Sequence, residues 1–176
     1  MSRSLKRKRD QPNIIWIMRG IPGTGKTTTA LRLKQLYEKY GHKVYYFNRD
    51  NTRLLYCAKH NMVYDKSFND PTTNTIVRDK YYEEIERIVR MTRPARKIII
   101  VDSTNTKIAD LRKLFYVLDL TKDKDYLYLN NPRKVYIVTK RKIRGNQHNV
   151  PENIIKKFEE ELKESDEYLK KQIYKK

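Results

Sequence analysis

Along the chain, short apolar runs alternate with longer segments in which apolar residues recur every three or four positions. The short runs predict four buried strands, at Ile14–Met18, Val44–Phe47, Lys97–Val101 and Val135–Val138. The longer segments predict helices that end at Gly41, that run from Asp70-Pro71 to Pro94, that span Ala109–Leu120, and that start at Pro151. This alternation predicts an α/β fold with a parallel sheet of about four strands and helices on both faces.

The pattern fits one domain over residues 13–176, preceded by a basic arm over residues 1–12 that we expect to be disordered. A polar connection, Thr121–Asn131, separates the third helix from the fourth strand. In the last helix, Ile155, Phe158, Leu162 and Leu169 form an apolar stripe. Ligands of parallel sheets bind beyond the carboxyl ends of the strands, so the segments that follow each strand are the candidates for chemistry.

The first strand leads into Gly20-Ile21-Pro22-Gly23-Thr24-Gly25-Lys26-Thr27, which matches the phosphate-binding pattern G-x-x-x-x-G-K-[ST] in full. Its glycines allow backbone N–H groups to surround phosphate oxygens, Lys26 can reach the β- and γ-phosphates, and the Thr27 hydroxyl can coordinate Mg²⁺. The motif therefore predicts a P-loop NTPase-type fold that binds ATP and Mg²⁺. The expected nucleotide-binding residues are Gly20, Gly23, Thr24, Gly25, Lys26, Thr27 and Thr28.

Two charged residues, Asp50 and Arg53, follow the second strand. A kinase needs a carboxylate near the γ-phosphate, to orient the acceptor hydroxyl and to accept its proton. If the segment is helical, Asp50 and Arg53 lie on one face, and Arg53 can hold an anionic substrate beside the base. The pattern is also compatible with a helix-capping aspartate and a surface arginine.

The third strand ends in Asp102, the position of the carboxylate that serves Mg²⁺ in P-loop enzymes. We expect Asp102 and Thr27 to hold the metal, although a turn aspartate that caps the next helix would look the same. The three histidines lie far apart in the sequence, so no other metal is expected.

A basic loop, Lys140–Asn149, follows the fourth strand and is expected to form a lid. Arginines of such a loop can clamp phosphates and neutralise charge in the transition state, and Arg141 and Arg144 are the candidates for this catalytic role. The alternative is a solvated basic loop.

Three segments, GIPGTGKT, NRDNTR and IIIVDSTNT, resemble the P-loop polynucleotide 5′-hydroxyl kinase family, of which the bacteriophage kinase domain is an example. This resemblance implies transfer of the γ-phosphate of ATP to the 5′-hydroxyl of DNA or RNA. It also implies that Asp50 is the general base and that Arg53 contacts the phosphate on the 3′ side of the acceptor nucleoside. The sequence departs from the family by an inserted Ser103 and by a lid one residue longer before Pro151, which leaves the roles of the individual lid arginines open.

The chain is strongly basic, with 40 Lys and Arg residues against 21 Asp and Glu residues and a net charge of +19. Such a charge attracts polyanions, so a nucleic acid substrate is the expected partner. A lysine-rich composition that reflects an AT-rich genome would give a similar charge. We expect no membrane span and no secretory signal, because the apolar runs are short and residues 1–10 are polar. Cys57 is the only cysteine, which favours an intracellular protein, cytoplasmic or nuclear.

Aromatic and basic residues are mixed between positions 54 and 82, a composition that suits stacking on nucleobases. They are Tyr56, Lys59, Tyr64, Lys66, Phe68, Arg78, Lys80, Tyr81 and Tyr82. The simpler interpretation is that most of these tyrosines pack a helix. Two other functions remain open from the residues, a kinase of small molecules and a nucleotide-gated module that binds nucleic acid.

Overall fold

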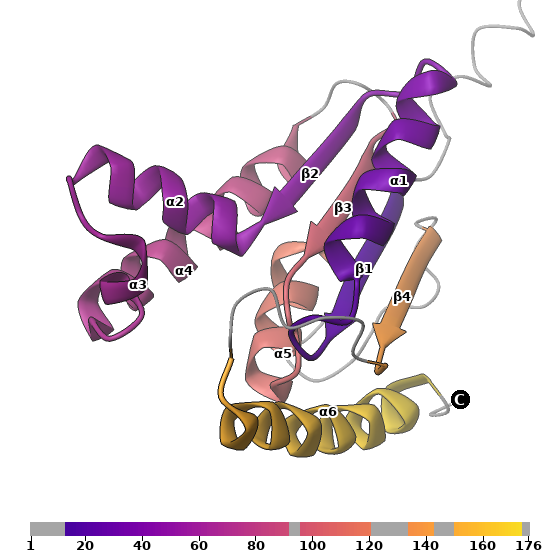
Figure 1. Ribbon diagram of the computed structural model, residues 1–176. Helices are drawn as coiled ribbons and strands as arrows, with labels where there is room; N and C mark the ends of the chain where they lie inside the picture. The colour runs from indigo at the N-terminus through magenta and orange to yellow at the C-terminus, as the bar shows by residue number, and fades with distance from the viewer. Residues whose placement is uncertain (1–12, 92–95, 121–133, 143–149, 174–176) are drawn as a thin grey trace, which may run out of the picture.

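The computed structural model describes residues 13–91, 96–120, 134–142 and 150–173, and it has a single parallel sheet (Figure 1). The strand order is β2-β3-β1-β4. The strands are β1 (Ile14–Gly20), β2 (Val44–Asn48), β3 (Ile98–Asp102) and β4 (Lys134–Lys140). The predicted α/β fold with a parallel sheet of four strands is therefore confirmed. The basic arm at residues 1–12 and lid residues 143–149 lie outside the described residues.

Six helices accompany the sheet in the described ranges. They are α1 (Lys26–Lys39), α2 (Arg49–Lys59), α3 (Tyr64–Ser67), α4 (Pro71–Arg90), α5 (Ile108–Val117) and α6 (Glu152–Ile173). Four of them match predicted helices, whereas α2 and α3 were not predicted as elements. In α2 the buried residues are Arg53 and Cys57, while Leu54 and Leu55 are exposed. The buried positions of this helix hold an arginine and a cysteine while two leucines face solvent, so its apolar residues do not mark the face that packs against the protein.

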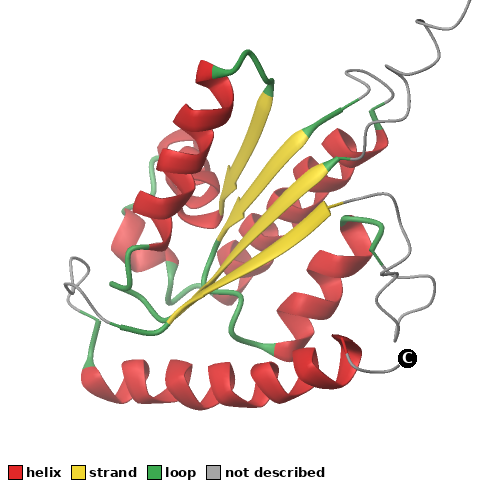
Figure 2. Cartoon of the chain, turned by 90° about the vertical axis from the view of Figure 1, so that its right-hand side faces the viewer, coloured by secondary structure: helices red, strands yellow, loops and turns green. Residues whose placement is uncertain are grey.

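Successive strand residues face opposite sides of the sheet, and each side has its own core. Ile15, Ile17, Ile99 and Val101 pack with residues of α4 and α5, whereas Ile14, Met18, Ile98 and Ile100 pack with Ala30 of α1. Figure 2 shows the helices on both sides of the sheet, as the alternation predicted. The central strand β3 is buried along its whole length.

The last helix, α6, lies across the end of the sheet at which the strands terminate (Figure 1). Two residues of its predicted stripe, Leu162 and Leu169, are buried. The same face is also polar, because Asp166 accepts a hydrogen bond at 2.5 Å from Arg19, which is fully buried in β1, and Ser165 accepts a second. Arg141, after β4, binds the other oxygen of Asp166. One carboxylate of α6 therefore joins the ends of β1 and β4.

Gly20 lies where β1 passes into the phosphate loop and β4 comes unusually close to it. Its φ is +136°, and a Cβ atom at this position would lie 2.0 Å from the carbonyl oxygen of Lys140. The neighbouring atoms belong to the backbone of a paired strand, so they cannot move aside without breaking the ladder between β1 and β4.

We expect Gly20→Ala to destabilise the fold, because both the backbone conformation and the contact with Lys140 exclude a side chain. Chemical denaturation should show a lower midpoint. Gly41→Ala is the matched control for a positive φ alone, since φ is +75° there and nothing lies within 4 Å of the added Cβ. Equal losses in the two variants would contradict a steric role for Lys140.

Asp166→Ala should destabilise the protein by about 3–5 kcal/mol, because it leaves the buried Arg19 guanidinium without its counter-ion. Glu167→Ala is the control on the same helix, since its ion pair with Lys170 is exposed and its loss should have little effect. Burial opposes the shift, but hydrogen bonds from Arg141 and Arg19 lower the pKa of Asp166 below its usual value. Its contribution should therefore be complete above about pH 4 and should disappear as the pH falls through the lowered pKa. Urea unfolding of both variants at several pH values measures this, and a pH-independent difference would contradict it.

Candidate active site

The phosphate loop connects β1 to α1 and points the start of that helix toward the carboxyl ends of the strands. Gly25 is the N-cap of α1, with φ of 79°, and within the described structure no side chain caps the helix. The first N–H groups of α1 are therefore available to an anion, and the helix dipole favours negative charge there. Thr27 and Thr28 lie exposed in this first turn.

Inside the loop, two side chains converge on one carbonyl group. The Lys26 ammonium and the Thr24 hydroxyl both donate hydrogen bonds to the Ile21 oxygen, at 2.7 and 2.8 Å. Burial lowers the pKa of Lys26, and the carboxylates of Asp102 and Asp50 oppose this effect. The predicted phosphate ligand therefore lies in the field of both predicted carboxylates.

Asp102 is the last residue of β3 and is 1% exposed. Its Oδ2 atom accepts hydrogen bonds from the Tyr46 hydroxyl at 2.8 Å and from the Asn48 amide at 2.9 Å. Burial first, and then Asp102 itself, raise the pKa of Tyr46 above its usual range, so the phenol remains a donor. Among the described residues Oδ1 has no hydrogen-bond partner and remains available to a cation. Asp102 does not cap α5, whose N-cap is Lys107.

Asn48 has a second role at the start of α2. Its Oδ1 atom accepts a hydrogen bond from the backbone N–H of Asn51 at 2.9 Å, so Asn48 is the N-cap of the helix. Asp50 is consequently not the cap. It lies exposed in the first turn of α2 and, within the described part of the chain, makes no hydrogen bond or ion pair. This leaves its carboxylate accessible to a substrate.

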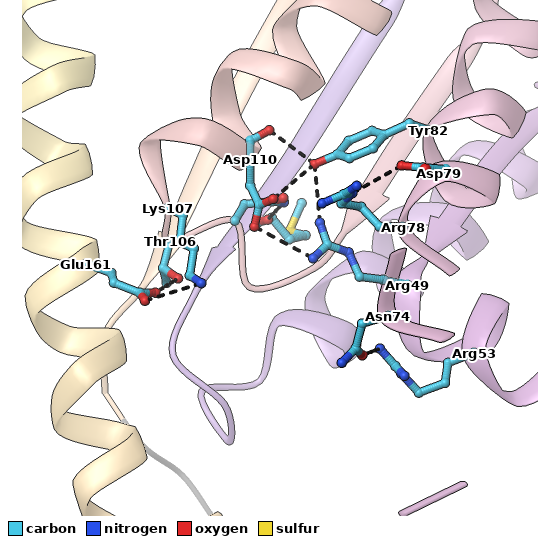
Figure 3. A network of polar contacts seen from close by, with 12 residues as sticks. Arg49, Arg53, Asn74, Arg78, Asp79, Tyr82, Thr106, Lys107, Asp110 and Glu161 are labelled. Carbon is cyan, nitrogen blue, oxygen red and sulfur yellow. Dashed lines mark hydrogen bonds and ion pairs between the residues drawn. The ribbon is translucent and has the colours of Figure 1, made fainter. Parts of the chain in front are cut away.

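Arg53 lies on α2 one turn after Asp50, but it points into the protein. It is 6% exposed, and its guanidinium donates to the Ser67 carbonyl and hydroxyl oxygens, both at 3.1 Å, and to the Asn74 amide oxygen at 2.7 Å. Figure 3 shows the contact with Asn74. The structure thus gives Arg53 a positioning role between α2, α3 and α4, and its predicted contact with a substrate phosphate stays a prediction.

Arg49, next to Asp50, fixes the first turn of α2 to the helices behind the sheet (Figure 3). Its guanidinium forms an ion pair with Asp110 of α5 at 3.7 Å and donates to the Tyr82 hydroxyl at 3.3 Å. Burial opposes a raised pKa of Arg49, but Asp110 and the two tyrosines outweigh it. Tyr81 and Tyr82 are buried, so the simpler interpretation of these two tyrosines as packing residues is confirmed.

The residues of the predicted lid are only partly described. Arg141 is 58% exposed at its side chain and binds Asp166 of α6. Arg144 lies outside the described residues. The catalytic roles of both arginines therefore stay predictions.

Several residues of the site escaped the sequence analysis, namely Tyr46, Asn48, Arg49, Arg19 and Asp166. Asn48 carried a usable signal, because an Asn between a strand and a helix is a favoured N-cap. The others depend on partners far away in the sequence, such as Asp110 for Arg49 and α6 for Arg19.

The arrangement fits ATP and Mg²⁺. In the described ranges no three His, Cys, Asp or Glu side chains gather at a potential metal site. Mg²⁺ commonly binds one or two protein oxygen atoms together with phosphate oxygens and water, and the Asp102 carboxylate and the Thr27 hydroxyl are donors of this kind. Asp102 and Thr27 are the residues that would hold the ion, beside the uncapped start of α1.

A family model described as chromatin associated protein KTI12 matches residues 14–167, which include every strand and most of α6. The chain belongs to the KTI12 family. This membership covers the phosphate loop, the Asp50 turn and the Asp102 strand end. The narrower assignment to the polynucleotide 5′-hydroxyl kinases stays a prediction.

Among solved structures, a mutant of the APS kinase CysC from Mycobacterium tuberculosis is similar to this KTI12-family chain, with 12% sequence identity and a TM-score of 0.44. The match covers 91% of this chain and 98% of that one. No curated protein matches the sequence. No helix in the described ranges is long and apolar enough to cross a membrane.

Asp102→Asn should weaken Mg²⁺-dependent binding of ATP much more than metal-free binding, because it removes the charged ligand but preserves an acceptor for Tyr46 and Asn48. Isothermal titration with ATP, with and without Mg²⁺, measures the difference. Asp119→Asn is the control, an exposed aspartate near the end of α5. An unchanged effect of Mg²⁺ in Asp102→Asn would remove Asp102 from the metal site.

Proposed function

We propose that this KTI12-family protein is an ATP- and Mg²⁺-dependent phosphotransferase whose acceptor is the 5′-hydroxyl of a polynucleotide. The observation that supports this best is the arrangement of Lys26, Asp102 and Asp50. They lie at or just after the carboxyl ends of three neighbouring strands, and the two carboxylates both act on the pKa of the Lys26 ammonium. A phosphate ligand, a buried carboxylate and an accessible carboxylate are the parts that phosphoryl transfer needs.

In the proposed reaction, Lys26 and the first N–H groups of α1 bind the β- and γ-phosphates of ATP. Asp102 and Thr27 would hold Mg²⁺, which would supply positive charge to neutralise the phosphates. Asp50 accepts the proton of the acceptor hydroxyl as its oxygen forms a bond to the γ-phosphorus. The bond from that phosphorus to the β–γ bridging oxygen breaks, and ADP leaves with the electron pair.

Two features favour a polynucleotide over a small acceptor. The net charge of +19 attracts a polyanion, and the resemblance of the motif segments to the polynucleotide 5′-hydroxyl kinases gives the same substrate class. Binding of a polynucleotide should weaken steeply with added salt as counter-ions are released, whereas binding of a neutral small acceptor should not.

A second candidate is a module that binds nucleic acid under the control of ATP, without transfer to an acceptor. The description of the family as chromatin associated favours it and suggests a nuclear location. The engagement of Arg53 by Ser67 and Asn74 also favours it, because this side chain would otherwise contact the acceptor.

Asp50→Ala separates the two candidates. If Asp50 is the base, the variant should lose about 10²–10⁴-fold in the rate of transfer and keep its affinity for ATP. The assay follows labelled γ-phosphate of ATP onto a 5′-hydroxyl oligonucleotide, with a 5′-phosphorylated oligonucleotide and free nucleosides in parallel.

Asp79→Ala is the control for loss of an acidic residue, since Asp79 lies half-exposed on α4 in a surface pair with Arg78. Transfer in Asp50→Ala at the rate of the unmodified protein would reject Asp50 as the base. Label on nucleosides alone would favour a small-molecule kinase. If the unmodified protein transfers no label but binds oligonucleotides only with ATP present, the second candidate is supported.

A further inference from the structure

Phe68, directly after α3, is an aromatic ring that is both exposed and rigidly supported. It is 47% exposed, although the Arg53 guanidinium lies over its ring at 4.2 Å from the centroid. Tyr64 meets it edge to face at 5.1 Å. The Asn74 amide also donates to the Phe68 carbonyl oxygen at 2.8 Å. Both the backbone and the inner side of this residue are therefore fixed.

Two residues of the support, Arg53 and Ser67, are buried, and its members are bonded to one another. Ser67, which holds Arg53, donates its hydroxyl to the Tyr64 carbonyl oxygen at 2.6 Å, and Asn74 binds Arg53 and Phe68 at once. An exposed ring gains little stability from such a framework, because its outer surface contacts only water. A framework that fixes an exposed ring is the arrangement of a surface that binds a flat ligand.

This ring also lies close to the proposed base. Asp50 and Arg53 are three residues apart on α2, so they lie within one turn of the helix, Asp50 exposed and Arg53 directed inward. The Arg53 guanidinium, one turn after Asp50, lies over the Phe68 ring, and Tyr64 packs edge to face against the same ring. The exposed ring therefore lies beside the turn of α2 that follows the proposed base. Burial first and then the carboxylate of Asp50 raise the pKa of the Tyr64 hydroxyl to about 12, while Arg53 opposes this.

We propose that Phe68, backed by Arg53, is the platform on which the terminal nucleobase of the single-stranded acceptor stacks, so that its 5′-hydroxyl reaches Asp50. This inference rests on the proposed function and specifies its acceptor site. Stacking of a base on an aromatic ring contributes about 1–3 kcal/mol and tolerates any base, because every base has a π face. The buried guanidinium adds positive charge behind the ring in a strongly basic protein. In this proposal Arg53 contributes to acceptor binding without touching the acceptor, because it supports the inner side of the Phe68 ring.

The experiment compares two single-stranded oligonucleotides with a 5′-hydroxyl, one intact and one abasic at the 5′-terminal nucleoside. Fluorescence anisotropy gives their dissociation constants for the unmodified protein, Phe68→Leu and Phe68→Trp. The unmodified protein should bind the abasic strand about 5- to 100-fold more weakly. Phe68→Leu should bind the intact strand more weakly by a similar factor and should discriminate little between the two strands. Phe68→Trp should retain the discrimination.

Tyr116→Leu is the matched control, because Tyr116 is 55% exposed on α5 with the Lys113 ammonium 5.7 Å from its ring centroid. It should behave as the unmodified protein. ATP affinity, measured for each variant, checks that the fold is intact. Equal affinity of the unmodified protein for both strands would overturn the platform, as would full discrimination in Phe68→Leu.

Label transfer on the same oligonucleotides separates this inference from the proposed function. If label is transferred but the transfer depends neither on Phe68 nor on the terminal base, the proposed kinase activity is supported and the Phe68 platform is overturned. Binding that depends on both, without transfer, would keep the platform and overturn the kinase activity. If the oligonucleotides do not bind at all, both proposals fail.

Discussion

The side-chain amide of Asn48 connects the two carboxylates on which the candidate site depends. Its nitrogen holds the buried Asp102 at the end of β3, and its oxygen caps the helix whose first turn carries Asp50. The parallel register makes this possible, since Asn48 is the direct partner of Asp102 across the sheet. A slip of one residue between β2 and β3 would turn one of these side chains to the opposite face and separate the pair. The site therefore depends on strand register as much as on its own residues.

Two arginines connect the residues around the candidate site to helices that pack against the sheet. Arg49 fixes the turn that carries Asp50 to α4 and α5, and Arg19 fixes the last part of β1 to α6. Both side chains lie beside residues of the candidate site, and both need a carboxylate from a distant helix. A buried guanidinium without its partner is costly, so each pair restricts how the helices can be placed. These arginines contribute positive charge to the composition but are not available to bind a polyanion.

The elements with a clear apolar period were predictable from the sequence, and so was the phosphate loop. Four strands and four helices follow from the apolar pattern, because burial on both faces of the sheet gives continuous runs such as Ile98–Val101, whereas burial on one face of a helix gives the spacing of residues such as Leu162. The helix after β2 did not, because its inner positions hold Arg53 and Cys57. The position of Asp102 at a strand end could be predicted, but its bonds to Tyr46 and Asn48 could not. Arg53 is the clearest example of what the sequence does not predict. Its spacing from Asp50 predicts that the two residues lie within one helical turn, but not whether the Arg53 side chain points to solvent or to Ser67.

Asp166 holds Arg19 with one oxygen and Arg141 with the other. A phosphate that recruits Arg141 competes with this carboxylate for the guanidinium, so its binding yields less free energy than capture of an unpaired arginine. The ion pair between Arg19 and Asp166 would persist, so α6 remains attached to β1 when Arg141 binds the phosphate. The Asp166 carboxylate thus stabilises the fold and at the same time lowers the affinity of Arg141, after β4, for anions. A substitution that raises this affinity by removing the carboxylate would lower the stability.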